Sequence, residues 1–290
     1  MTASPKWSDR FWTSVDGLKL HYRDYDGPLD RPPILCLPGL TRNAADFEPV
    51  ADGFAGDWRV LSVDFRGRGK SQCDPKSANY RPKTYVEDLL KLLDQLGIAD
   101  AVFFGTSLGG LVTMAMAAGD GERIAGALLN DIGPEIDPRG LERIATYVGK
   151  PVTFDSFAAA VDRISDRNAD IYPDFSRDQW EAFVRRIMRG NDTSGWQFDY
   201  DMKIAETFTA PADSSQFDGW HYFRSLAGRP VTILRGELSD LLSAEVAARM
   251  CGEIEDCELV TVPRVGHTPT LEEPESIAAL ERLLVRVSAT

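Results

Sequence analysis

The chain has 290 residues, of which 43% are hydrophobic, and its formal net charge at pH 7 is -13. This length and composition fit one large globular core with an inserted subdomain, and they exclude a disordered chain. The negative charge argues against binding to nucleic acid or to an anionic membrane surface, because both favour basic patches; a local basic pocket stays compatible with it.

No segment of the sequence indicates export or membrane insertion. Residues 1–6 hold no apolar stretch that could act as a signal peptide, and nowhere do about eighteen apolar residues follow one another. The cysteines form no Cys-x-x-Cys pair and no cluster with histidines. They are Cys36, Cys73, Cys251 and Cys257. We therefore expect a cytoplasmic protein without a disulfide framework, a metal site or a membrane span.

The first predicted elements form a β-hairpin. Residues 11–15 and 18–25 are predicted as strands on either side of Asp16-Gly17, a dipeptide that accepts the positive φ angles of a tight turn.

Short apolar runs then alternate with helix-like segments such as residues 84–96. The runs are residues 34–37, 60–63, 102–104, 127–129 and 231–234. Residues 259–262 are expected to form the last strand and residues 274–287 the closing helix. Strands that are apolar on both faces and alternate with helices indicate an α/β fold with a mostly parallel sheet covered on each side.

Residues 134–226 interrupt this alternation, because they contain no convincing strand and many aromatic residues. Helix-like apolar spacing is present at 154–164 and 178–188, with Asp155 and Ser176 as predicted caps. We expect a helical cap at 134–226, inserted into a core formed by residues 1–133 and 227–290. Such a cap would cover the sheet edge where ligands bind in open α/β folds. Most of its aromatic residues, Phe217 among them, are expected to hold the insertion together.

Gly105-Thr106-Ser107-Leu108-Gly109 is the most informative segment of the chain. An apolar run precedes it and a small-residue helix pattern follows it, which is the context of a Gly-x-Ser-x-Gly nucleophile elbow. The two glycines let the strand and the helix approach without collision of β-carbons. The segment predicts Ser107 as a catalytic nucleophile.

A serine hydroxyl needs a base within hydrogen-bond reach, and the chain has three histidines. His267 follows the last predicted strand and should emerge at the same sheet edge as the elbow, so it is the expected base. His21 lies in the hairpin, where a structural role is expected. His221 lies among aromatic residues of the insertion, where packing or lining of a pocket is expected.

The base needs a carboxylate on its other ring nitrogen. Asp240 follows the 231–234 run and precedes His267, so it is the preferred acid. Asp131 follows the 127–129 run at the same edge and is the alternative, and Glu237 shares the loop of Asp240. For the oxyanion of acyl transfer, the expected donors are the backbone N–H groups of Leu108 and Leu40.

With these residues, the chain resembles the α/β-hydrolase superfamily from the hairpin to the last helix. The shared segments are Leu37-Pro38-Gly39, Asp64 to Ser71, Asp131-Ile132-Gly133-Pro134 and Gly266-His267. The resemblance implies a helical cap and the hydrolysis of an ester or a related bond. Pro38 departs from the pattern, because many relatives have a histidine at this position.

Two segments that could suggest a cofactor lack the necessary glycines. Gly69-Lys70-Ser71 is preceded by Asp64 where a phosphate-binding loop needs glycine, and Ser107 occupies the second glycine position of a dinucleotide fingerprint. We therefore expect no cofactor.

The expected function is a serine hydrolase that cleaves a small or medium carboxylester or lactone through an acyl-enzyme, in an apolar pocket. The alternatives are a carbon-carbon bond hydrolase and, as a different class, a ligand-binding receptor on the same fold. Arg42, near the oxyanion loop, could hold a substrate carboxylate, although an ion pair is the favoured role. The sequence leaves the oligomeric state open.

Overall fold

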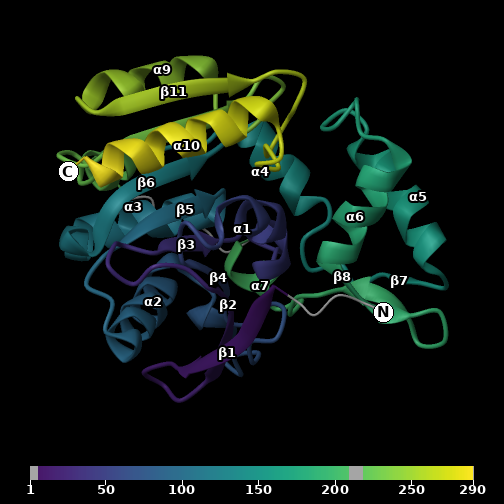
Figure 1. Cartoon of the computed structure of the whole chain (residues 1–290). Coiled ribbons are helices and arrows are strands. Elements are labelled where there is room, and N and C mark those ends of the chain that lie inside the picture. The colour runs from purple at the N-terminus through teal and green to yellow at the C-terminus, as the bar shows by residue number, and fades with distance from the viewer. Residues whose placement is uncertain (1–5, 209–217, 290) are drawn as a thin grey trace.

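The computed structural model describes residues 6–208 and 218–289, so residues 209–217 of the expected cap, including Phe217, lie outside the described residues. The central sheet has the strand order β1-β2-β4-β3-β5-β6-β10-β11 (Figure 1). Its strands are Trp7–Thr13 (β1), Lys19–Tyr25 (β2), Ile34–Leu37 (β3), Val60–Asp64 (β4), Ala101–Thr106 (β5), Ile124–Asn130 (β6), Val231–Gly236 (β10) and Cys257–Val262 (β11). Pairs β1–β2 and β2–β4 are antiparallel and the others are parallel, so the expected mostly parallel sheet is confirmed.

Helices cover both faces of the sheet, because the strand side chains alternate between two apolar layers. Phe103 of β5 packs in the layer that contains α2 (Pro82–Leu96), α3 (Leu108–Asp120) and α9 (Ala244–Glu253). Its neighbour Phe104 packs in the layer that contains α1 (Glu48–Phe54) and α10 (Pro274–Ser288). Within the described ranges, no helix is both long and apolar enough to cross a bilayer.

The segment between β6 and β10 holds short helices and a second sheet, and in Figure 1 α5, α6, β7 and β8 gather to one side of the central sheet. Its elements are α4 (Pro138–Ala145), β7 (Thr153–Phe154), α5 (Phe157–Asn168), α6 (Arg177–Ile187), β8 (Met188–Asn191), β9 (Gly195–Phe198), α7 (Ile204–Phe208) and α8 (Gly219–Arg224). The expectation of no strand here is wrong, because β7, β9 and β8 form an antiparallel sheet. These strands have two to four residues and little burial, so they lack a clear apolar pattern.

The aromatic residues of this segment pack mainly on one another. Tyr172 contacts the rings of Trp180 and Phe183 at centroid distances of 5.8 and 5.7 Å. Ser176 caps α6 as expected, in a capping box with Gln179. The cap of α5 is Ser156 rather than the expected Asp155.

Candidate active site

Ser107 occupies a sharp turn between β5 and α3, with φ 52° and ψ -111°. A positive φ is unfavourable for a residue with a side chain, and such strain is typical of functional sites. A Cβ atom on Gly105 would lie 2.6 Å from the backbone of Gly109, and one on Gly109 would lie 2.1 Å from the carbonyl oxygen of Leu37. Both glycines are therefore needed for the strand and the helix to meet at this turn, as the sequence predicts.

His267 connects the serine to a carboxylate. Its Nε2 lies 2.9 Å from Ser107 Oγ, and its Nδ1 lies 2.7 Å from Asp131 Oδ2. The side chains of His267 and Asp131 are 8% and 0% exposed, so the hydrogen bond between them is shielded from water. In this geometry the imidazole can receive a proton from the serine while the carboxylate holds the opposite nitrogen.

The carboxylate that contacts His267 is thus the alternative acid, Asp131, and the preference for Asp240 is corrected. Asp131 directly follows β6, with φ 56°, and the end of β10 and the loop after it fix its side chain. The backbone N–H of Gly236 donates to Oδ1 at 2.9 Å, and the hydroxyl of Ser239 donates to Oδ2 at 2.6 Å. The loop that contains Asp240 therefore supplies donors to the acid rather than the acid itself.

Asp240 forms a two-point ion pair with Arg143 of the α4 helix. Arg143 Nε donates to Oδ2 at 2.5 Å and Nη2 donates to Oδ1 at 2.8 Å. Hydrogen bonding to Arg143 lowers the pKa of Asp240, which keeps this carboxylate ionised. The other carboxylate of the loop, Glu237, accepts a hydrogen bond from the backbone N–H of Arg264.

The loop after β3 brings Leu40 to the serine. A Cβ atom on Gly39 would lie 3.8 Å from Ser107 Cβ, so this loop passes directly beside Ser107. Arg68 fixes the loop through hydrogen bonds of 3.0 and 2.8 Å to the carbonyl oxygen of Leu40. Leu108 begins α3, where backbone N–H groups have no acceptor within the helix. Leu108 directly follows Ser107, and Leu40 directly follows Gly39 and lines the same cavity as Ser107, so the role of both N–H groups at the oxyanion stays a prediction.

The other two histidines lie away from this constellation. His21 is buried between Asp64 and Asp9, at 2.7 and 2.9 Å, which agrees with a structural role. His221 is exposed on α8. Asp64 also accepts the backbone N–H of Lys70 at 2.9 Å, so the Gly69-Lys70-Ser71 segment is a turn tied to the strand end.

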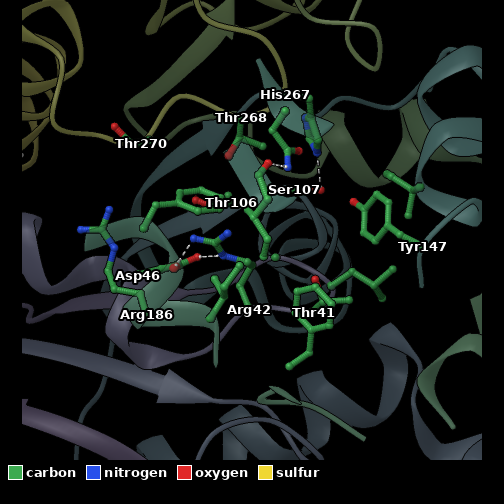
Figure 2. A pocket seen from close by; sticks show the side chains of 18 of the residues that line it. Thr41, Arg42, Asp46, Thr106, Ser107, Tyr147, Arg186, His267, Thr268 and Thr270 are labelled. Atoms are coloured by element: carbon green, nitrogen blue, oxygen red, sulfur yellow. Dashed lines mark hydrogen bonds and ion pairs between the residues drawn. The ribbon is translucent and has the colours of Figure 1, made fainter. Parts of the chain in front are cut away.

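A cavity of about 340 Å³ opens beside Ser107 and His267 (Figure 2). Tyr172 lines it and donates a hydrogen bond of 2.8 Å to the carbonyl oxygen of Thr268, next to the catalytic-base candidate. Burial raises the pKa of Tyr172 to about 12, so its hydroxyl stays protonated as a donor. The lining is more basic than the expected apolar pocket. Its cationic residues are Arg42, Arg143, Lys150, Arg167 and Arg186. Across the described part of the chain, no group of three or more metal-ligating side chains is present.

Comparison with known proteins gives consistent matches along the whole chain. The model of the "Alpha/beta hydrolase family" matches residues 34–280. A 3-hydroxybutyrate-oligomer hydrolase from Cupriavidus necator is 33% identical, over 96% of this chain and 97% of its own. A 2-(acetamidomethylene)succinate hydrolase from Mesorhizobium japonicum is 27% identical, over 86% of this chain and 84% of its own. The crystal structure of an alpha/beta hydrolase from Novosphingobium aromaticivorans superposes with a TM-score of 0.93, at 52% identity, over 98% of this chain and 100% of the other.

Proposed function

We propose that this chain, which belongs to the alpha/beta hydrolase family, is a serine hydrolase. It cleaves a short carboxylester through an acyl-enzyme. One observation carries the proposal. His267 lies within hydrogen-bond distance of Ser107 on one side and of Asp131 on the other, at 2.9 and 2.7 Å. A ligand-binding receptor has no need of this arrangement.

In the first half of the reaction, Ser107 Oγ attacks the ester carbonyl carbon while His267 Nε2 takes the hydroxyl proton. Asp131 accepts a hydrogen bond from Nδ1 and stabilises the imidazolium that forms. The backbone N–H groups of Leu40 and Leu108 bind the oxyanion. The bond between the carbonyl carbon and the leaving oxygen then breaks, and the alcohol departs with the proton held by His267.

In the second half, water attacks the acyl-enzyme and His267 takes one of its protons. The bond between the acyl carbon and Ser107 Oγ breaks, and His267 returns the proton to the serine. The products are a carboxylic acid and an alcohol. No cofactor takes part in either half.

The similarity to a 3-hydroxybutyrate-oligomer hydrolase supports an ester of a short hydroxyacid as the substrate class. The cavity volume of about 340 Å³ suits a ligand of this size.

The test is covalent labelling by a fluorophosphonate, combined with turnover of 4-nitrophenyl butyrate and of the 3-hydroxybutyrate dimer. We expect one label per chain on the unmodified protein and none on Ser107→Ala. The substitutions Ser107→Ala and His267→Ala should each lower kcat by at least about a thousandfold without loss of the folded state. Near-normal turnover by either variant, or substrate binding without any turnover or labelling, would contradict the proposal.

A further inference from the structure

The cavity lining is mainly basic, whereas the chain as a whole has a negative net charge. The chain carries 45 acidic and 32 basic residues, yet among the described residues that line the cavity the only ionisable carboxylate is Asp46, against five cations. A ligand that enters this cavity therefore meets a local positive potential in a protein that is otherwise acidic.

Three of these five cations have their own carboxylate partner. Arg143 pairs with Asp240 and Arg186 with Glu272, at 2.5 and 2.7 Å. The remaining two cations, Lys150 and Arg167, are exposed and have no acidic partner among the residues that the structure describes. Two positive charges at the cavity thus stay without a counter-charge from the described residues.

The third paired cation, Arg42, is placed beside the nucleophile. A Cβ atom on Gly39 would lie 3.4 Å from Arg42 Cγ and 3.8 Å from Ser107 Cβ, so both side chains lie close to Gly39. Figure 2 shows Arg42 below Ser107, with dashed contacts to Asp46. The guanidinium lies 4.2 Å from the ring centroid of Phe183, and the side chain is only 21% exposed.

Asp46 holds the guanidinium of Arg42 in place but does not use all of its hydrogen-bond donors. Asp46 accepts hydrogen bonds from Nε and Nη2, at 2.5 and 2.6 Å. The N–H groups of Nη1 have no acceptor among the described residues, although a guanidinium has five donors. Burial alone would lower the pKa of Arg42, but the effect of Asp46 is larger and raises this pKa. The guanidinium is therefore a permanent cation in a partly buried position.

We propose that the cavity selects esters that carry a free carboxylate close to the scissile bond, and that Arg42 binds this carboxylate through Nη1 while Lys150 and Arg167 attract it at the rim. The inference rests on the proposed serine hydrolase function and adds a specificity residue to it. A charge-assisted hydrogen bond in a shielded place is stronger than one at the surface, so Arg42 should contribute most.

The position of Arg42 limits the length of the substrate. Because Arg42 and Ser107 both lie close to Gly39 and both line the cavity, we expect a carboxylate on Nη1 to belong to the unit that flanks the ester rather than to a distant part of a long chain. In an ester of a 3-hydroxyacid, four bonds separate the ester carbonyl carbon from the carboxylate carbon. This spacing is that of a short oligoester of a hydroxyacid, attacked at its carboxylate end.

The experiment uses two substrates that differ only in charge: the 3-hydroxybutyrate dimer as free acid, and the same dimer with its terminal carboxylate converted to a carboxamide. For the unmodified protein we expect kcat/KM to favour the acid by about tenfold or more. Arg42→Gln should bring this ratio close to one, through a higher KM for the acid and little change for the carboxamide.

Two variants show whether the guanidinium group of Arg42 or a general loss of structure is responsible. Arg42→Lys keeps the charge and should keep part of the preference. Asp46→Asn keeps the guanidinium but removes its counter-charge, so the preference for the acid should rise. At the rim, Arg167→Gln should lower kcat/KM for the acid about two- to fivefold at low salt. Arg163→Gln is its matched control, because Arg163 is exposed one turn away on α5 and does not line the cavity.

Equal turnover of acid and carboxamide by the unmodified protein, or an equal loss on both substrates in Arg42→Gln, would overturn the inference. The same response of Arg167→Gln and Arg163→Gln would overturn the role of the rim. A different result, the absence of Ser107-dependent turnover of 4-nitrophenyl butyrate, would contradict the proposed function itself.

Discussion

The groups that can perform the chemistry and most of the cations around them come from two different parts of the molecule. Ser107, Asp131 and His267 follow β5, β6 and β11 at one edge of the central sheet. The segment between β6 and β10 contributes the following cations to the cavity: Arg143, Lys150, Arg167 and Arg186. The sheet edge thus supplies the reacting geometry and the inserted segment supplies charge, so substitutions in the first should lower kcat and those in the second should act on substrate choice.

The largest expected effect separates the two aspartates that the sequence could not rank correctly. Asp131→Asn removes the carboxylate that stabilises the imidazolium in the proposed mechanism, and kcat for 4-nitrophenyl butyrate should fall by about a thousandfold or more. Asp240→Asn weakens only the contact with Arg143 in the inserted segment, and kcat should change less than tenfold. Far-UV circular dichroism of both variants serves as the folding control. A larger loss in Asp240→Asn would restore the original assignment.

The next largest effect concerns the close contact between α3 and the end of β3 at the sheet edge. Gly109→Ala would place a Cβ atom 2.1 Å from the carbonyl oxygen of Leu37, so the backbone must shift. We expect the free energy of unfolding to fall by about 3 kcal/mol, measured by urea denaturation. Gly119→Ala, in the same helix α3, meets nothing within 4 Å and should stabilise the protein by about 0.5 to 1 kcal/mol. Equal effects would mean that the contact at Gly109 is not what limits this position.

Most of the sheet edge could be predicted from the sequence because its strands, the turn at Ser107 and the position of His267 each have a local signal. Apolar runs mark the strands, paired glycines mark the turn at Ser107, and the order of loops places His267 beside it. The choice between Asp131 and Asp240 has no such signal. The strands β6 and β10 are parallel neighbours, so the loops after both reach the same edge, and the partner of Asp240 lies 97 residues away in α4.

The inserted segment was harder to predict for a physical reason. Its strands are too short and too exposed to show alternation, whereas apolar spacing predicts the helices α5 and α6 and Ser176 predicts the start of α6. The basic lining of the cavity also has no sequence signature. Its cations are spread from Arg42 to Arg186, and only the fold gathers them around one space.

The smallest expected effect tests how the two parts are held together. Among the ion pairs that connect them, two differ in exposure. Arg143 and Asp240 are 29% and 30% exposed, whereas Asp174 and Arg264 are 59% and 62% exposed. Arg143 lowers the pKa of Asp240 in the folded protein, so this ion pair stabilises the folded state at pH values above the pKa that Asp240 has in the unfolded chain. This stabilisation is lost as the pH falls through the lower pKa that Asp240 has in the folded state. Asp240→Asn should therefore cost about 1 kcal/mol or less at pH 7.

This cost should shrink as the pH falls below the usual pKa of an aspartate, which urea denaturation at pH 7 and near pH 3 would measure. Asp174→Asn is the control, because its pair with Arg264 joins the same two parts but is open to solvent, and no measurable cost is expected at either pH. A cost of Asp240→Asn that stayed constant between the two pH values would show that the aspartate acts through shape and packing rather than through its charge. The inserted segment would then be held on the sheet by its aromatic and backbone contacts, such as the hydrogen bond from Gly266 N–H to the carbonyl oxygen of Ile171.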